Sequence, residues 1–134
     1  AGVGAGLGYG HNTLAALMTR GLAEMKRLGV AMGAESSTFS GLAGMGDLVL
    51  TCTGDLSRNR TVGFRLGSGD TIEEILSEMS SVAEGVKTTE SVHELSERHQ
   101  VEMPITKEVY TMLKLGGSPE QALLNLMGRE PTSE

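Results

Sequence analysis

Residues 45–53, MGDLVLTCT, decide the fold class of this 134-residue chain. The β-branched side chains of Val49, Thr51 and Thr53 give this segment the composition of a strand. An isolated strand would leave its backbone hydrogen-bonding groups without partners, and the sequence contains no second strand-like segment that could pair with it. We therefore predict that the segment is helical and that the chain is all-α, a single compact multi-helix domain.

The apolar residues on both sides of this segment recur at helical spacing, three or four residues apart. Start and stop signals delimit the predicted helices, as serine or proline at the beginning and glycine at the end. The helices run from Asn12 to Leu28 with Gly29 as the stop, from the Ser57 cap through Leu66, from an Asp70 cap with Glu73 completing a capping box to Met79, from Gly85 to Arg98, from Pro104 to Leu113, and from Ser118 to Gly128.

Glycine occupies every second position at the start of the chain, at residues 2, 4, 6, 8 and 10. A period of two does not give the GxGxxG spacing of a dinucleotide loop, and no strand precedes the run. We predict instead a helix of small residues that packs closely against its neighbours, followed by a turn at Gly8 to Gly10.

The composition fits one core of ordinary size, since 39% of the residues are hydrophobic. Aromatic residues are only 3% of the chain, so we expect an aliphatic core with the eight methionines as packing residues. The formal net charge of −6 argues against nucleic acid or an anionic membrane as a partner. Cys52 is the only cysteine, which favours a reducing compartment, the cytoplasm. We interpret Cys52 as a buried structural thiol.

The segment 46–60 carries one carboxylate at its start, several hydroxyls, an amide and two guanidiniums. With Ser57 as an N-cap, the backbone amides of residues 58–60 would point to the same place as the Arg58 side chain. Arginine, amide and helix N-terminus together suit a phosphate. We predict a site for a small phosphorylated and hydroxylated molecule, with the alternative that Ser57 is only a cap and the arginines are solvated.

If residues 45–53 are helical, Asp47 and Thr51 are four residues apart and share one face. They would then line one wall of the pocket, with Ser57, Arg58 and Asn59 at the other. The alternative for Asp47 is a helix cap. The three histidines, His11, His93 and His99, lack metal-ligand spacing, so we expect surface histidines and no metal site.

The segment 41–60 resembles the substrate-binding segment of the NAD(P)-dependent sn-glycerol-3-phosphate dehydrogenases. Residues 8–13 and 17–25 resemble the helix that leads into the C-terminal domain in that family. Residues 83–89 and 101–106 resemble two further family blocks in the same order. The resemblance therefore extends over nearly the whole chain.

The resemblance implies reversible hydride transfer between NAD or NADP and sn-glycerol 3-phosphate, giving dihydroxyacetone phosphate. It makes Asp47 the catalytic carboxylate that also touches the substrate. Arg58 and Asn59 hold the phosphate in this interpretation, with help from Ser57 and Thr51. Arg58 also reaches the cofactor, and the two further residues implied to approach it are Val82 and Glu84. By composition alone, Glu84 is an ordinary acidic residue at a helix start.

The resemblance also implies a two-domain enzyme whose Rossmann domain and catalytic lysine lie before residue 1. We expect residues 1–128 to be the helical substrate domain and residues 129–134 a disordered tail. Such a chain should be inactive alone and should form a homodimer in the full enzyme, which supplies glycerol 3-phosphate for glycerophospholipid synthesis. Preference between NAD and NADP stays open, because the residues that read the ribose belong to the other domain.

Two alternatives belong to other functional classes. One is a free-standing helical interaction module, which would depend on an apolar groove rather than on Arg58. The other is the helical domain of a different Rossmann-linked dehydrogenase, acting on a hydroxyacyl-CoA or a phosphogluconate. The block from Asp47 to Asn59 favours the glycerol phosphate enzymes over both.

Overall fold

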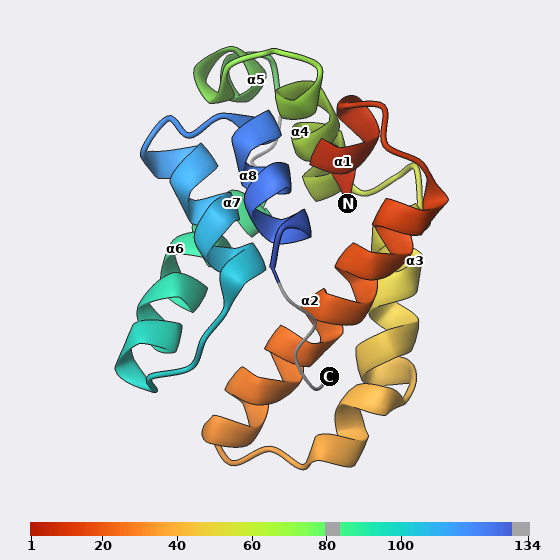
Figure 1. Ribbon diagram of the computed structural model, residues 1–134, viewed down its shortest axis with the longest axis vertical. Coiled ribbons are helices and arrows are strands. Elements are labelled where there is room, and N and C mark those ends of the chain that lie inside the picture. Colours follow the sequence, from red (N-terminus) through yellow and green to blue (C-terminus); the bar gives the residue numbers. More distant parts are fainter. Residues whose placement is uncertain (80–83, 130–134) are drawn as a thin grey trace.

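The computed structural model describes residues 1–79 and 84–129, and in that part of the chain every regular element is a helix (Figure 1). The elements are α1 (Gly2–Gly6), α2 (His11–Ala31), the 3-10 helix η1 (Ser36–Ser40), the π-helix η2 (Leu42–Gly46), α3 (Asp47–Thr53), α4 (Arg58–Gly67), α5 (Ile72–Glu78), α6 (Glu84–Arg98), α7 (Pro104–Lys114) and α8 (Pro119–Met127). The all-α prediction is confirmed, and residues 45–53 are helical, as the end of η2 and the whole of α3.

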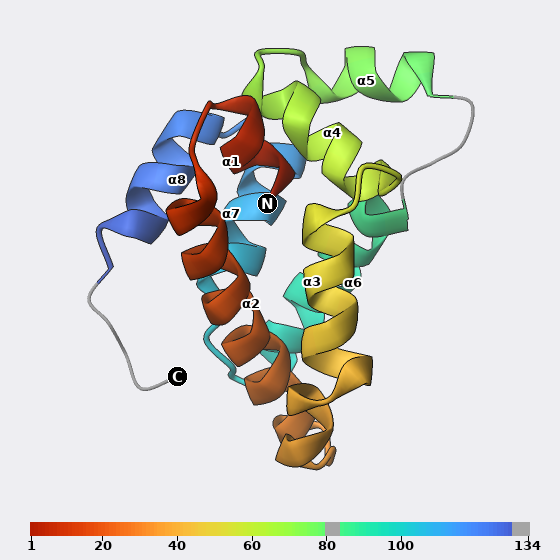
Figure 2. The same ribbon diagram turned by 90° about the vertical axis from the view of Figure 1, so that its right-hand side faces the viewer.

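Helix α2 lies at the centre of the arrangement, with α3 along one side and α7 along the other (Figures 1 and 2). Helix α7 also packs against α6 and α8, and α1 packs against α4. Helix α5 lies at the end of the molecule away from the turn between α2 and η1. Within the described residues, no helix combines the length and apolar character needed to cross a bilayer.

Helices α1 and α4 approach each other backbone to backbone through glycines. A Cβ on Gly6 would lie 2.2 Å from the carbonyl oxygen of Phe64, and one on Gly67 would lie 2.4 Å from that of Val3. Both distances are shorter than any real contact of this kind, so only glycine fits. The small-residue helix predicted from the alternating glycines is therefore confirmed, and Gly8 makes the expected turn with a positive φ of 82°.

A compact group of buried aliphatic side chains connects α4 and α5. Val62, Leu66 and Ile75 form it, and Ile75 has no exposed surface. Methionine contributes to the buried set through Met103 and Met112. The prediction that all eight methionines are packing residues is wrong, because some of them are exposed, namely Met25, Met32 and Met127.

The predicted end of α2 at Gly29 is wrong. The helix continues to Ala31, and Gly33 makes the turn with a φ of 96°. Gly29 lacks a side chain for a different reason, since a Cβ there would lie 2.1 Å from Cζ of Phe39. The lack of a side chain at Gly29 lets the ring of Phe39, in η1, pack directly on α2. This is a tertiary contact, which the local sequence around Gly29 does not indicate.

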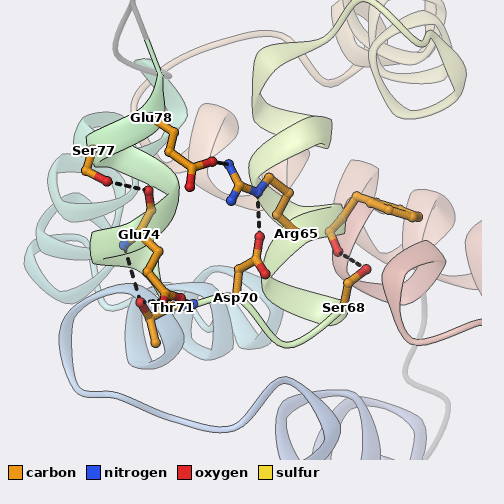
Figure 3. Close-up of polar contacts among 8 residues, drawn as sticks. Arg65, Ser68, Asp70, Thr71, Glu74, Ser77 and Glu78 are labelled. Carbon is orange, nitrogen blue, oxygen red and sulfur yellow. Dashed lines mark hydrogen bonds and ion pairs between the residues drawn. The ribbon is translucent and has the colours of Figure 1, made fainter.

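The predicted Asp70 cap is one residue out of register. Thr71 is the N-cap of α5, and its hydroxyl and the Glu74 carboxylate form the capping box (Figure 3). Asp70 instead accepts a hydrogen bond from Nε of Arg65 at 2.5 Å, and Arg65 also pairs with Glu78 at 2.8 Å. Arg65 thus ties the start and the end of α5 to α4.

Glu24 of α2 is a buried carboxylate, only 3% exposed, and it caps the N-terminus of α7. Its Oε1 accepts from the backbone N–H of Ile105 at 2.6 Å, and its Oε2 accepts from that of Thr106 at 3.2 Å. These amides have no partner within their own helix. Burial raises the pKa of Glu24, and the hydrogen bonds from α7 oppose that rise. One side chain therefore fixes α7 on α2.

Candidate functional site

Ser57 begins α4, as predicted. Its Oγ accepts a hydrogen bond from the backbone N–H of Arg60 at 3.2 Å. Arg58 and Asn59 are consequently the first two residues of a ten-residue helix, at its electropositive end. The interpretation of Ser57 as a cap is confirmed, and a contact between its hydroxyl and a ligand stays a prediction.

Asn59 connects the beginnings of two helices. Its Oδ1 accepts a hydrogen bond from the backbone N–H of Gly85, the second residue of α6, at 3.0 Å. Asn59, Gly85 and Ala1 also line a pocket of about 210 Å³ between α1, α4, α6 and α7. The sequence gives no indication of this contact, because the two residues are 26 positions apart.

Asp47 and Thr51 lie one turn apart on α3, and both are exposed. Their spacing of four residues puts them on one face of the helix. The N-cap of α3 is Gly46 and no side chain caps the helix, so the alternative interpretation of Asp47 as the cap is wrong. Asp47 is instead an acidic residue in the first turn, which the helix dipole favours.

A second pocket, of about 280 Å³, separates α3 from α1 and the start of α2. Ala1, Cys52 and Arg60 line it, together with residues from Gly4 to Leu17. Arg60 also pairs with Asp55 in the link between α3 and α4, with 3.3 Å between Nη1 and Oδ1. Cys52 is half-buried rather than fully buried, and burial raises the pKa of its thiol.

The two pockets do not bring all the predicted site residues together. Asn59 lines one of these two pockets, whereas Asp47, Thr51 and Arg58 line neither. Ala1 lines both pockets, so the start of the described chain lies between Cys52 and Asn59.

The two residues predicted near the cofactor lie around the start of α6. Glu84 is the first residue of that helix and is exposed. Its position agrees with the interpretation as an acidic residue at a helix start. Val82 lies outside the described residues.

The histidines are not uniformly at the surface. The ring of His93 is half-buried and stacks on Tyr110, with centroids 4.1 Å apart. His11 and His99 are exposed, as expected. In residues 1–79 and 84–129, no group of three or more His, Cys, Asp or Glu side chains is placed to hold a metal ion.

Comparison with known proteins decides the family. The model of the family described as NAD-dependent glycerol-3-phosphate dehydrogenase C-terminus matches residues 1–124. The chain belongs to this family. Over 134 residues it is 63% identical to glycerol-3-phosphate dehydrogenase (NAD(P)+) of Oleidesulfovibrio alaskensis, and over 130 residues it is 65% identical to that of Trichlorobacter lovleyi.

A crystal structure of glycerol-3-phosphate dehydrogenase from Coxiella burnetii has the same fold. It aligns with a TM-score of 0.92 and 44% sequence identity over 96% of this chain and 39% of the other. The chain covers 41% of the Oleidesulfovibrio protein and 39% of the Trichlorobacter protein. It thus corresponds to about two fifths of its relatives, the C-terminal region of the dehydrogenase. These matches leave no support for the alternatives of an interaction module or another dehydrogenase.

Proposed function

We propose that this chain forms the substrate side of an enzyme that interconverts sn-glycerol 3-phosphate and dihydroxyacetone phosphate with NAD or NADP. The observation that carries the proposal is the start of α4, where Ser57 caps the helix and Arg58 and Asn59 occupy its first turn. A guanidinium, a carboxamide and the N-terminal backbone amides of α4 are donors of the kind that hold a phosphate dianion.

Charge supports placing the phosphate there. The whole chain has a net charge of −6, so an anionic substrate needs a local group of cationic and N–H donors. Arg58 offers two parallel N–H groups to one phosphate, and Asn59 adds the two N–H groups of its amide. Ser57 and Thr51 contribute hydroxyl donors at the edge of this site.

Proton transfer belongs to the other side of the substrate. Reduction of a carbonyl needs a proton donor at the oxygen, and oxidation of the alcohol needs the same group as a base. We assign this role to the lysine that the resemblance expects ahead of Ala1, with the Asp47 carboxylate orienting that lysine and the substrate hydroxyl.

The residues at the starts of α4 and α6 suit the nicotinamide end of the cofactor rather than its pyrophosphate. The described residues contain no strand, so the strand, glycine loop and helix that hold a pyrophosphate are not found among them. Arg58 and Glu84, at the starts of α4 and α6, would approach the nicotinamide end. The resemblance implies the same role for Val82, which lies outside the described residues. When bound, the nicotinamide supplies or accepts the hydride.

The wider role follows from the same assignment. We infer a cytoplasmic enzyme, a homodimer through this helical region, that works with its own Rossmann domain and supplies glycerol 3-phosphate for glycerophospholipid synthesis. The single cysteine supports the compartment, and the acidic charge argues against nucleic acid as a partner.

A fusion enzyme tests the proposal, with this chain replacing the matching C-terminal region of the Oleidesulfovibrio alaskensis protein, to which it is 63% identical throughout. We expect NADH oxidation that depends on dihydroxyacetone phosphate. A folded fusion enzyme without such turnover would contradict the proposal.

A further inference from the structure

The backbone N–H of Gly85 determines how the side chain of Asn59 is held. The N–H belongs to the second residue of α6 as the structure describes that helix, Glu84–Arg98, and within this range no carbonyl lies a turn before it. Asn59 Oδ1 accepts its hydrogen at 3.0 Å. The side chain of α4 thus serves as a cap for α6.

This contact also fixes which end of the Asn59 amide accepts the hydrogen bond from α6. A carboxamide has an acceptor at one end and two donors at the other. Because a backbone N–H only donates, Oδ1 must face Gly85, and a flipped amide would bring N–H against N–H. The Nδ2 group of Asn59 is therefore the donor end of the amide, and it lies beside Gly85 too, 2.9 Å from where a Cβ would be. Its two N–H groups are donors of the kind that suit a phosphate oxygen.

The absence of a side chain at Gly85 is what permits the contact. A Cβ at this position would lie 2.6 Å from Oδ1 and 2.7 Å from Cγ of Asn59. Backbone conformation does not account for this glycine, since the glycines with positive φ are Gly8, Gly33, Gly69 and Gly116. Close approach to Asn59 is the remaining reason.

We propose that Gly85 is a positioning residue for the substrate phosphate, acting through Asn59. Its N–H orients the amide, and its lack of a side chain leaves room for it. This inference rests on the proposed function, and it adds a residue of α6 to the phosphate-binding residues at the start of α4.

Kinetics of the fusion enzyme test the proposal. In Gly85→Ala we expect the KM for dihydroxyacetone phosphate to rise by about tenfold or more, the loss of roughly one oriented hydrogen bond to a charged group. Gly21→Ala is the matched control, because a Cβ there would have its nearest neighbour, Cδ1 of Ile105, at 4.0 Å. We expect the KM of the control to stay within about twofold of the wild type. A KM equally unchanged in Gly85→Ala would overturn the inference.

A double-mutant cycle separates positioning from a general structural effect. In an Asn59→Ala background the clash is gone, so adding Gly85→Ala should change the KM by less than about twofold. If Gly85→Ala instead multiplies the KM of Asn59→Ala by its full effect, it does not act through Asn59. The double variant also keeps the comparison available should Gly85→Ala alone misfold.

Asn59→Asp separates the two ends of the side chain. Aspartate still accepts from Gly85 but has no donor for a phosphate. We expect an unchanged thermal midpoint and a substrate KM raised by at least about tenfold. An unchanged KM in Asn59→Asp would overturn the inference, whereas a wild-type fusion enzyme without turnover would remove the proposed function on which it rests.

Discussion

Arg58 is the residue on which phosphate affinity should depend most. Its guanidinium can make two parallel charge-assisted hydrogen bonds from the first position of α4. We expect Arg58→Ala to lower kcat/KM of the fusion enzyme by about 10- to 150-fold, the equivalent of about 1.5–3 kcal/mol. The kcat/KM of Arg58→Lys should lie between those of the wild type and Arg58→Ala, since lysine keeps the positive charge and cannot make two parallel hydrogen bonds.

The control for Arg58 is Arg98→Ala, at the opposite end of α6 from Gly85. Arg98 is exposed, and its loss should leave kcat/KM within about twofold of the wild type. Equal effects of the two substitutions would show that Arg58 contributes only general charge.

Glu24 makes the stability of the chain depend on pH. Burial raises its pKa, so the folded state binds the proton more tightly than the unfolded state does. The stability it contributes is therefore fully present below its unfolded pKa and is lost as the pH rises through its folded pKa. Relative to Glu24→Gln, the wild type should lose unfolding free energy as the pH rises above the ordinary range of a glutamate and through the raised folded pKa of Glu24, measured by urea denaturation.

Glu24→Ala provides the comparison. It removes the acceptor from the amides of Ile105 and Thr106, and we expect a loss of about 1–3 kcal/mol at a pH below the unfolded pKa of glutamate. The loss should shrink as the pH rises, because the variant lacks the contribution of Glu24 to the pH dependence. A wild type whose stability relative to Glu24→Gln rises with pH would show that the hydrogen bonds from α7 outweigh burial.

At the scale of elements, the contact between α1 and α4 should be the least tolerant of added volume. A Cβ on Gly67 would meet backbone atoms of α1, which cannot move aside as a flexible side chain can. We expect Gly67→Ala to cost at least about 1–3 kcal/mol of unfolding free energy, measured by urea denaturation of the chain. Gly10→Ala, with no atom within 4 Å of the added Cβ, should be tolerated.

The sequence predicted the elements better than their ends. Helical spacing, the caps at Ser57 and Ser118 and the proline at the first position of α7, Pro104, are local signals, and the structure confirms them. Gly29 could not be interpreted correctly, because its cause is the ring of Phe39 on another element. Asp70 and Thr71 are both good caps, and only the pairing of Asp70 with Arg65 distinguishes them.

In the candidate site, too, the sequence predicted local features but not contacts between helices. The sequence predicted the segment and the cap of α4, since these depend on neighbours in the chain. It could not predict the contact between Asn59 and Gly85, which needs two helices to meet. The glycine itself was the available signal, because a glycine in the first turn of a predicted helix is unfavourable unless something approaches it closely.

At the scale of the whole molecule, the chain should not be active by itself. The helical residues described here provide donors for the substrate but no strand-based cradle for the dinucleotide. We expect the isolated chain to show no NADH oxidation with dihydroxyacetone phosphate above a blank without protein. Robust turnover would contradict this division of roles.

The most direct measurement is a crystal structure of the fusion enzyme with NAD and sn-glycerol 3-phosphate bound. We expect the phosphate oxygens to lie within hydrogen-bond distance of Arg58 and of Nδ2 of Asn59, with Asp47 at the hydroxyl end of the substrate. A phosphate bound away from the start of α4, with Arg58 and Asn59 in contact with neither end of the substrate, would contradict it.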